Sequence, residues 1–315
     1  MKPTRMSEHC VITGAAGFLG TRLADVSRAA GLAPVGVDLA AVPRPDDWQR
    51  FHTGRTETLP WDRVLGDQPS VCFHLAGGAS VPLSVADPFH DFESLVPGTV
   101  RLLTALARHA PNCVLVLFSS AAVYGAPAVL PVTETQAAAP VSPYGVHKWL
   151  AEEAVAHYAR LFGLRTVVLR IFSAYGEGLR KQLFWDLCCK AAAAGPSGTV
   201  ELAGTGDETR DFIHATDVAR AALAAARQAS TPGCTRLNVA SGREVTVREA
   251  ATTMLDALGW HTQLRFGGHV RPGEPTRWAA DVSRLGALGF APGMSLSDGL
   301  AAYARWFSSE PGGGR

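Results

Sequence analysis

A tyrosine and a lysine four positions apart, Tyr144 and Lys148, form the pair in this chain whose residue types and spacing best suit chemistry. On a helix, residues at this spacing share one face, so the ammonium would lie beside the phenol. Tyrosine has a pKa of about 10 and is a poor base at neutral pH, but a nearby positive charge or a helix N-terminus favours the phenolate. The pair therefore predicts a general base for an alcohol. The alternative is a lysine that only covers a surface tyrosine.

Supporting residues precede the pair in the sequence. Ser142 and Pro143 are typical of a helix N-cap and a first helical position, which predicts a helix over 143–162. Ser120 follows the apolar run 114–119, and a hydroxyl at the carboxyl end of a parallel strand faces the crevice where ligands bind. This serine could hydrogen-bond the oxygen that the tyrosine deprotonates, or it could be an ordinary turn serine.

Three glycines, Gly14, Gly17 and Gly20, follow an apolar run at 9–13 and open a helical stretch at 17–30. The backbone N–H groups and the dipole at a helix N-terminus can hold a phosphate, and glycine keeps side chains out of its way. The last glycine lets the helix pack closely on the sheet. The spacing GxxGxxG between a strand and a helix therefore predicts a dinucleotide site.

An aspartate, Asp38, closes the next apolar run at 34–38. An acidic side chain at this point can accept hydrogen bonds from an adenosine ribose and repel a 2′-phosphate, which favours NAD over NADP. Two alternatives stay open. The residue could be an ordinary turn aspartate, and the nearby Arg44 could serve NADP.

Apolar runs alternate with amphipathic stretches over the first half of the chain. This alternation indicates βαβ units, so the fold expected is α/β, with a Rossmann-type doubly wound parallel sheet. From about residue 175, glycine- and proline-rich pieces interrupt the pattern, which predicts a smaller α/β C-terminal substrate lobe. The apolar runs cover 9–13, 34–38, 71–75, 114–119 and 166–172, and the main helical stretches cover 17–30, 88–109 and 143–162.

The expected domain boundaries follow from this change of pattern. Residues 1–172 should form the NAD-binding Rossmann domain, completed by a returning segment around 207–242. Residues 173–206 and 243–315 should form the substrate-binding lobe.

The composition argues against several classes of function. Basic and acidic residues nearly balance, at 29 against 28, so a broad nucleic-acid surface is not expected. No run of about 18 apolar residues is present, so no helix should span a membrane. The six cysteines show neither CxxC nor zinc spacing, so no metal site is expected. The polar N-terminal segment is unlike a secretory signal, which predicts a cytoplasmic protein.

Taken together, these residues resemble the extended short-chain dehydrogenase/reductase superfamily. The closer likeness is to its NAD-dependent nucleotide-sugar epimerase/dehydratase family, of the UDP-glucose or UDP-glucuronate 4-epimerase type, and it covers nearly the whole chain. Further segments that carry the likeness are His74-Leu-Ala-Gly77, Ser80-Val-Pro-Leu-Ser84 with Asp87-Pro88, Leu169 to Gly176, Gly204 to Val218, and Arg271-Pro-Gly-Glu274. The chain departs from the family pattern at Leu95 and Ser173, where asparagine is expected, and at Gly54-Arg55-Thr56-Glu57, where the family has GDxxD.

The resemblance implies a mechanism for the residues singled out above. Tyr144 would remove a proton from a sugar hydroxyl, usually on C4, while Ser120 aligns that hydroxyl. Lys148 would hold the nicotinamide ribose and, with the cationic nicotinamide, favour the phenolate. Hydride would pass to NAD to give a ketone, which in an epimerase takes the hydride back on its other face.

The resemblance also implies the binding residues. Arg210 and Arg271 would clamp the diphosphate or nucleoside of a nucleotide sugar, since arginine suits charge-assisted contacts. Arg180 and Lys181 could bind a carboxylated sugar such as a uronic acid, or form a solvated charge pair; we assign no role to 182–190. The cofactor set is Gly14, Gly17, Phe18, Leu19, Gly20, Asp38, Leu75, Ala76, Gly77, Tyr144 and Lys148, and the substrate set is Ser80, Ser120, Ser173, Arg180, Arg210 and Arg271.

Two alanines, Ala121 and Ala122, discriminate within the family. The dehydratases carry Asp-Glu there, the related decarboxylases keep a glutamate at the second position, and fucose-type enzymes place a cysteine there, whereas alanine transfers no proton. Simple redox chemistry at one carbon remains, so a C4-epimerase is the first hypothesis and a 4-ketosugar reductase the second. A catalytically silent NAD-binding regulator is the third. The family usually forms homodimers through two helices, here those near 88–109 and 143–162.

Overall fold

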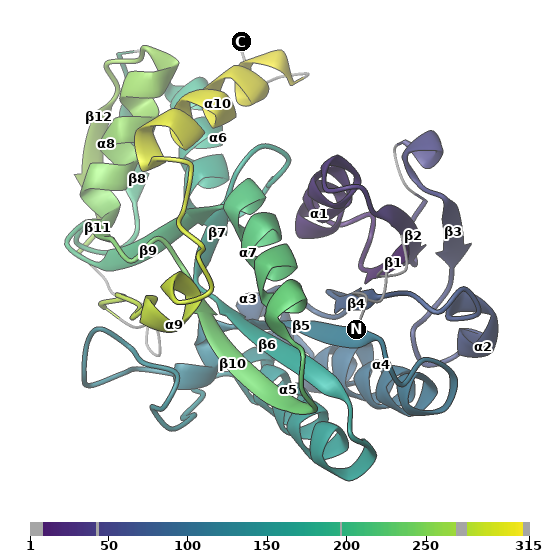
Figure 1. The fold of residues 1–315 in the computed structure, drawn as a ribbon. Coiled ribbons are helices and arrows are strands. Elements are labelled where there is room, and N and C mark those ends of the chain that lie inside the picture. The colour runs from purple at the N-terminus through teal and green to yellow at the C-terminus, as the bar shows by residue number, and fades with distance from the viewer. Residues whose placement is uncertain (1–8, 42–43, 196, 269–275, 311–315) are drawn as a thin grey trace.

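The computed structural model describes residues 9–41, 44–195, 197–268 and 276–310. Its largest element is a seven-stranded sheet in which all neighbouring strands are parallel, in the order β10-β6-β5-β4-β1-β2-β3 (Figure 1). This confirms the predicted Rossmann-type sheet, and each predicted apolar run forms a strand. The strands are β1 (His9–Thr13), β2 (Ala33–Asp38), β3 (Arg50–Thr53), β4 (Val71–His74), β5 (Val114–Ser120), β6 (Arg165–Ile171) and β10 (Gly233–Val239).

The sequence pattern does not predict β3. This strand lies at the edge of the sheet, and its four residues are exposed or half-buried. Because it packs on one neighbouring strand only, it needs no apolar run, and hydrophobic periodicity cannot detect it.

Helices cover both faces of the sheet. Alternate strand residues point to opposite faces, so Ile12 lies in a core with α1 and α7, while its neighbour Val11 lies in a second core with α4 and α5. The three long predicted helices are confirmed in α1, α4 and α5. The helices of this part are α1 (Phe18–Ala29), α2 (Trp61–Val64), α3 (Val81–Ala86), α4 (Pro88–His109), α5 (Pro143–Phe162) and α7 (Ala215–Gln228), with short 3₁₀ turns η1 (Pro45–Asp47) and η2 (Ala121–Tyr124).

The strand order reverses at β1. From this strand the chain continues to β2 and β3 on one side, and it then crosses to β4, β5 and β6 on the other side. The loops after β1 and β4 therefore lead away from each other. Such a switch point opens a crevice at the carboxyl ends of the strands, where α/β proteins bind ligands.

The other described elements form two small sheets and further helices. The small sheets share a core with α6, α8 and α10, whereas Leu285 of α9 belongs to a core of the large sheet. Figure 1 shows α6, α8 and α10 gathered on the opposite side of the molecule from β3 and α2. Within the predicted returning segment 207–242, β10 joins the large sheet and α7 packs on that sheet. The strand β9 of this segment instead belongs to the three-stranded sheet. The elements are β7 (Ser173–Tyr175), β9 (Thr209–His214) and β11 (Glu244–Thr246); β8 (Thr199–Leu202) and β12 (Gln263–Phe266); and α6 (Gln182–Ala194), α8 (Val247–Leu258), α9 (Ser283–Gly286) and α10 (Leu296–Ser309).

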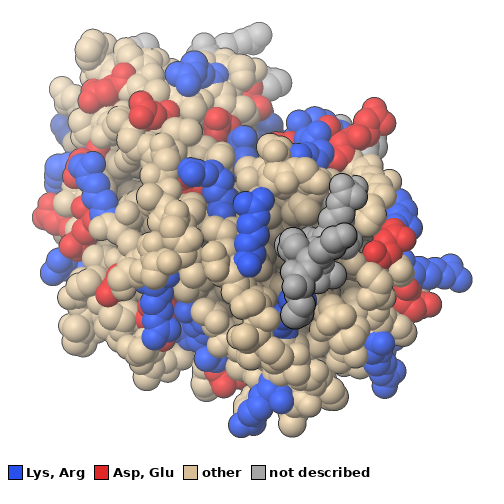
Figure 2. Space-filling model, viewed as in Figure 1, with Lys and Arg blue, Asp and Glu red and all other residues tan. Residues whose placement is uncertain are grey.

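Charge is spread thinly over the surface. Figure 2 shows basic and acidic side chains scattered among uncharged ones on the face in view, with no continuous patch of either sign. Within the described residues, none of the helices has the length and apolar character needed to cross a membrane.

Candidate active site

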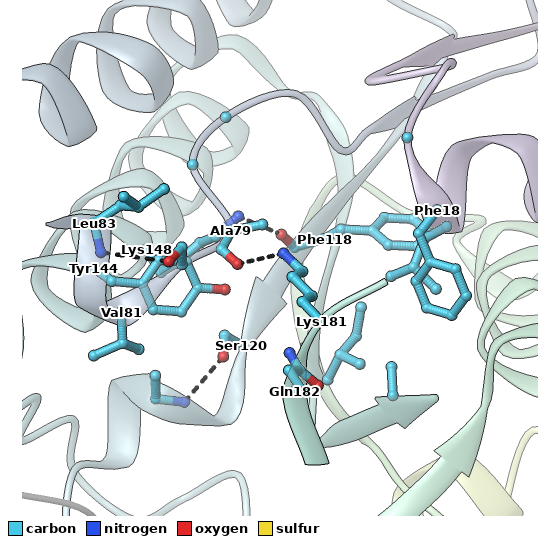
Figure 3. A pocket seen from close by; sticks show the side chains of 18 of the residues that line it. Phe18, Ala79, Val81, Leu83, Phe118, Ser120, Tyr144, Lys148, Lys181 and Gln182 are labelled. Atoms are coloured by element: carbon cyan, nitrogen blue, oxygen red, sulfur yellow. Dashed lines mark hydrogen bonds between the residues drawn. The ribbon is translucent and has the colours of Figure 1, made fainter. Parts of the chain in front are cut away.

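A cavity of about 1360 Å³ lies at the carboxyl ends of the parallel strands (Figure 3). The sheet supplies one wall, and α6, β9 and neighbouring loops supply the other. Every residue of the predicted cofactor set lines this cavity. Four residues of the predicted substrate set line it as well: Ser80, Ser120, Ser173 and Arg210.

The glycine turn after β1 has no room for side chains. Gly14 has φ +69°, and a Cβ there would lie 2.9 Å from the Ala76 backbone nitrogen. A Cβ on Gly20 would lie 2.1 Å from the Gly14 carbonyl oxygen. Gly17 is the N-cap of α1 and provides no side-chain cap. The positive end of this helix therefore faces the cavity without a protein side chain on it, as an anion site requires.

The carboxylate of Asp38 is fixed at the end of β2. Its Oδ2 accepts a hydrogen bond from the Ala16 backbone N–H at 2.9 Å, which ties the strand to the glycine turn. Arg44, the alternative contact for an NADP phosphate, does not line the cavity. Its guanidinium pairs with Asp25 and Asp47, each at 3.0 Å. The geometry at this end of the cavity therefore favours a free ribose, and so NAD.

A buried histidine fixes the position of the loop after β4. His74 Nδ1 is 2.7 Å from the Thr13 hydroxyl, and Nε2 is 2.9 Å from the Thr99 hydroxyl. The Thr13 oxygen in turn accepts hydrogen bonds from the backbone N–H groups of Leu75 and Ala76. Burial, with a smaller effect from the charge of a nearby lysine, lowers the pKa of His74 to about 3. A neutral imidazole therefore holds the cofactor-side loop in place.

Tyr144 and Lys148 lie in the first turns of α5, as the spacing predicts. Ser142 caps this helix by accepting a hydrogen bond from the Gly145 N–H at 3.2 Å. The Lys148 Nζ lies 5.7 Å from the centre of the Tyr144 ring. The same ammonium donates a hydrogen bond to the Phe118 carbonyl oxygen at 3.1 Å, which anchors it at the end of β5. Figure 3 shows both side chains in the cavity with Ser120.

The electrostatics of this pair differ from the prediction. We expected the helix N-terminus and the ammonium to lower the pKa of Tyr144, but it is raised above its ordinary value. Burial of the phenol is the largest cause, and the charge of Asp91 adds to it, while the Ser120 hydroxyl acts in the opposite direction. Burial also lowers the pKa of Lys148 to about 8, against the effect of Asp91 and Glu152. The residues of this chain alone thus favour a protonated phenol.

The residues after Ser120 form η2 and carry no proton-transfer group. Ala121 and Ala122 both line the cavity. The Ser120 Oγ accepts a hydrogen bond from the Ala122 N–H at 3.2 Å, so its own hydrogen can point into the cavity. At this edge of the cavity, the described side chains therefore offer a hydroxyl and two methyl groups.

Arg180 and Lys181, the adjacent cations between β7 and α6, lie in different surroundings. Arg180 does not line the cavity; its guanidinium pairs with Glu310 and lies 5.8 Å from the centre of the Trp306 ring. The structure therefore does not support Arg180 as a substrate contact. Lys181 instead lines the cavity and donates a hydrogen bond to the Ala79 carbonyl oxygen at 2.8 Å (Figure 3). Arg271 lies outside the described residues.

Residues 182–190, which the sequence left without a role, form most of α6. Gln182, Leu183 and Phe184, in the first turn of this helix, line the cavity. This part of the chain is therefore a wall of the cavity. The sequence gives no motif for it, because apolar residues that line a cavity resemble those that fill a core.

Sequence reasoning also missed Asp91. This residue of α4 is nearly buried, lines the cavity and acts electrostatically on both Tyr144 and Lys148. Its carboxylate is 2.6 Å from Nδ1 of His147. The only signal in the sequence was a histidine directly before the lysine, and its partner lies 56 positions earlier.

A family model supports this arrangement. The model described as the NAD dependent epimerase/dehydratase family matches residues 10–240, well over half of the chain. The chain belongs to this family. The resemblance drawn from the sequence motifs is thereby confirmed.

Individual members of the family match over nearly the whole chain. The UDP-glucose 4-epimerase of Mycolicibacterium smegmatis is 31% identical over 315 residues, which cover 95% of this chain and 98% of that protein. The solved structure of MoeE5 in complex with UDP-glucuronic acid and NAD is 30% identical, with a TM-score of 0.85, and covers 95% of this chain and 98% of that one. The structure of MoeE5 with UDP-glucose and NAD has the same identity and coverage and a TM-score of 0.84.

The residues of the cavity fit the dinucleotide on which the epimerase/dehydratase family depends. Substituting Gly14 or Gly20 would push a Cβ against backbone atoms, which is expected where a turn must stay flat for a pyrophosphate. The fixed carboxylate of Asp38 suits ribose hydroxyl groups. Among the described residues, no group of three or more histidine, cysteine, aspartate or glutamate side chains could hold a metal ion.

Proposed function

We propose that this protein is an NAD-dependent epimerase that inverts C4 of a nucleotide-activated hexose. The observation that carries the proposal is the convergence of Ser120, Tyr144 and Lys148 in one cavity with the glycine turn, beside two alanines. This set can exchange a proton on a sugar hydroxyl but lacks the acids that elimination of water or carbon dioxide would need after Ser120.

Each residue has a defined task in this proposal. The turn with Gly14, Gly17 and Gly20 would hold the pyrophosphate through its uncovered backbone N–H groups. The Asp38 carboxylate would accept hydrogen bonds from the hydroxyl groups of the adenosine ribose. The chemistry supplied by bound NAD is reversible acceptance of a hydride from the sugar carbon. The pKa of Tyr144 is raised although Lys148 lies beside it, so deprotonation of the phenol would depend on the positive charge that the bound cofactor adds.

Proton transfer then proceeds through the chain's own side chains. Ser120 aligns the C4 hydroxyl, and Tyr144 takes its proton as the hydride leaves the carbon. The 4-keto sugar turns over in the cavity, and Tyr144 returns the proton when the hydride comes back to the other face. Protons and electrons balance within one turnover, so no NADH is consumed.

The substrate class follows from the cavity and the relatives. MoeE5 binds UDP-glucose and UDP-glucuronic acid in its solved structures, and the mycobacterial relative is a UDP-glucose 4-epimerase. We infer that this chain also takes a UDP-hexose or a related nucleotide sugar. Ser80, Ser173 and Arg210 line the same cavity and are the proposed substrate contacts.

A homodimer is part of the proposal. α4 and α5 pack side by side on one face of the sheet, and exposed apolar side chains occur on them and on the adjoining α3. Such residues on neighbouring helices are typical of a buried interface. Light scattering of the purified protein should give twice the chain mass. The exposed large apolar residues on these three helices are Val81, Leu83, Val85, Phe89, Trp149, Leu150, Leu161 and Phe162.

A cytoplasmic location fits the same proposal. The cysteines of the described structure are all free, which suits a reducing compartment. Fractionation of cells that express the tagged chain tests this assignment.

The decisive experiment is incubation of the purified protein with UDP-glucose and with UDP-glucuronic acid. Nuclear magnetic resonance identifies the C4 epimer through its ring couplings, while absorbance follows NADH. Formation of the epimer without a net change in NADH supports the proposal. Consumption of NADH with a 4-keto sugar would indicate the reductase, and NAD binding without turnover of a nucleotide-sugar panel would indicate the silent regulator.

A further inference from the structure

A buried aspartate–histidine pair lies beside the proposed base. Asp91 on α4 and His147 on α5 bring Oδ2 and Nδ1 within 2.6 Å of each other. Only 8% of the aspartate side chain and 12% of the histidine side chain are exposed. The carboxylate belongs to the wall of the cavity, so the pair connects the two packed helices at the site.

The surroundings hold the pair in one geometry. The Phe92 ring packs edge-on against the imidazole, with centroids 5.6 Å apart. Gly78 lies so close to the carboxylate that a Cβ there would be 2.3 Å from Asp91 Oδ1. Ser94 accepts a hydrogen bond from the Gly78 N–H and donates one to the Asp91 carbonyl oxygen. The imidazole thus holds one carboxylate oxygen, Gly78 lies against the other, and Ser94 fixes the Asp91 backbone.

His147 is the residue directly before Lys148. The charge of Asp91 raises the pKa of Lys148 and that of Tyr144. The other carboxylate that acts on Lys148 is Glu152, which is fully buried and paired with Arg170 at 2.7 Å. The partner of Asp91 is an imidazole rather than a guanidinium.

Three further titratable groups lie near Lys148 or line the same cavity. β4 contributes the neutral His74, and the segment before α6 contributes Lys181 across the cavity. On α4, His90 also lines the cavity. Asp91 is thus the carboxylate near Lys148 that has no arginine or lysine partner among the described contacts.

We propose that Asp91 and His147 are positioning residues for the Tyr144–Lys148 pair: the imidazole fixes the carboxylate, and the carboxylate stabilises the buried ammonium beside the phenol. The role in catalysis rests on the function proposed above, but the effect on the ammonium does not. Two readouts therefore separate the two ideas.

The first readout is the titration of Lys148 in the full chain without substrate. The chain has only four lysines, at positions 2, 148, 181 and 190, so lysine-selective ¹³C labelling gives few signals, and Lys148→Arg assigns the one required. In Asp91→Asn, we expect the titration midpoint of Lys148 to fall from about 8 by roughly one pH unit. His147→Asn keeps a donor near the Nδ1 position and should retain most of the original midpoint, whereas His147→Ala should lower it.

The second readout is the pH profile of turnover. Loss of the carboxylate lowers the pKa of both members of the pair, so the profile of Asp91→Asn should move toward acid, with kcat reduced and KM within about twofold. The matched control is His157→Asn, also on α5, whose Nδ1 accepts a hydrogen bond from Arg160 away from the cavity. This control should leave both readouts unchanged.

The outcomes are distinct. A wild-type protein that epimerises no nucleotide sugar, but whose Lys148 midpoint falls in Asp91→Asn, would overturn the proposed function and keep the positioning role. A folded Asp91→Asn variant, as judged by its melting temperature, whose Lys148 midpoint and pH profile match the wild type would overturn the positioning role. Equal losses in His147→Asn and His147→Ala would overturn the part assigned to the imidazole.

Discussion

The Lys148 ammonium lies 5.7 Å from the centre of the Tyr144 ring while it donates a hydrogen bond to the Phe118 carbonyl oxygen. The pKa of this ammonium is lowered to about 8, chiefly by burial. Because the proposed mechanism needs the charged form, kcat should fall as the pH rises through about 8. A profile of kcat against pH measures this, and a flat profile to well above that pH would contradict the role of the charge.

Stability changes in the opposite direction over the same window. The unfolded chain holds the lysine proton up to a pH of about 10, whereas the folded chain releases it near pH 8. The unfolded state therefore binds more protons between these values, and the contribution of Lys148 to the free energy of unfolding rises with pH. Denaturant titrations of the wild type and Lys148→Met measure this difference. If unfolding caused the loss of activity at high pH, the free energy of unfolding would instead fall as the pH rises.

Removal of the phenol oxygen should separate binding from chemistry. Tyr144→Phe should retain NAD binding and lose at least about 10²-fold in turnover, the low end of a general-base contribution. Isothermal titration with NAD and an epimerisation assay measure the two quantities. Tyr158→Phe, on the same helix with its hydroxyl 3.4 Å from Thr104, is the control and should stay near wild type. Near-normal turnover in Tyr144→Phe would remove tyrosine from the role of base.

The carboxylate of Asp38 should set the choice of dinucleotide. Asp38→Asn removes its negative charge and weakens its acceptance of ribose hydrogen bonds, so the preference for NAD over NADP should fall by about tenfold, given the usual strength of a charged hydrogen bond. Affinities for both dinucleotides measure the ratio. Asp46→Asn, in η1 and away from the cavity, is the matched control. An unchanged ratio in Asp38→Asn would move specificity to other residues.

A buried ion pair behind the cavity should contribute to stability. Glu152 is fully buried, pairs with Arg170 at 2.7 Å, and accepts a hydrogen bond from the Ser119 hydroxyl at 2.6 Å. Glu152→Gln leaves the buried guanidinium without its counter-charge, which typically lowers the free energy of unfolding by about 3–5 kcal/mol.

Denaturant unfolding measures the loss, and the exposed pair of Asp25 and Arg28 provides a control. Asp25→Asn should lower the free energy by less than about 1 kcal/mol, because exposed pairs are screened by water. Similar losses in the two variants would mean that burial of the Glu152 pair has no special effect.

Much of the fold could be predicted from the sequence, because burial on both faces of a parallel sheet leaves continuous apolar runs. The runs at 9–13 and 114–119 became β1 and β5 with nearly the same bounds. The edge strand β3 could not be predicted in this way, since an edge needs no such run. The glycine turn and the Tyr144–Lys148 pair were predictable because their spacing is local, within one turn or one helix.

Contacts between distant segments could not be predicted. Nothing in the sequence relates Asp91 to His147, although the helices place them 2.6 Å apart. The raised pKa of Tyr144 depends on burial, which spacing does not reveal. The two alternatives left open for Arg180 and Lys181 have a similar cause: two adjacent cations look equivalent in a sequence, but Arg180 pairs with Glu310 whereas Lys181 lines the cavity.

The different positions of Arg180 and Lys181 give a test of which sugar the protein binds. Lys181 lies in the cavity wall, and its ammonium donates a hydrogen bond to the Ala79 carbonyl oxygen at 2.8 Å. A carboxylate on the sugar would be a stronger acceptor than that carbonyl, and hydrogen bonds to charged groups contribute about 1.5–3 kcal/mol. Lys181→Met should therefore raise KM for UDP-glucuronic acid by about tenfold or more and change KM for UDP-glucose little.

Arg180→Met is the matched control, because it removes the adjacent cation outside the cavity. It should leave the ratio of the two KM values unchanged. If Arg180→Met changes the ratio and Lys181→Met does not, the loop must rearrange when the substrate binds. If Lys181→Met weakens both substrates equally, the ammonium contacts a group that both share, such as the diphosphate, rather than the carboxylate.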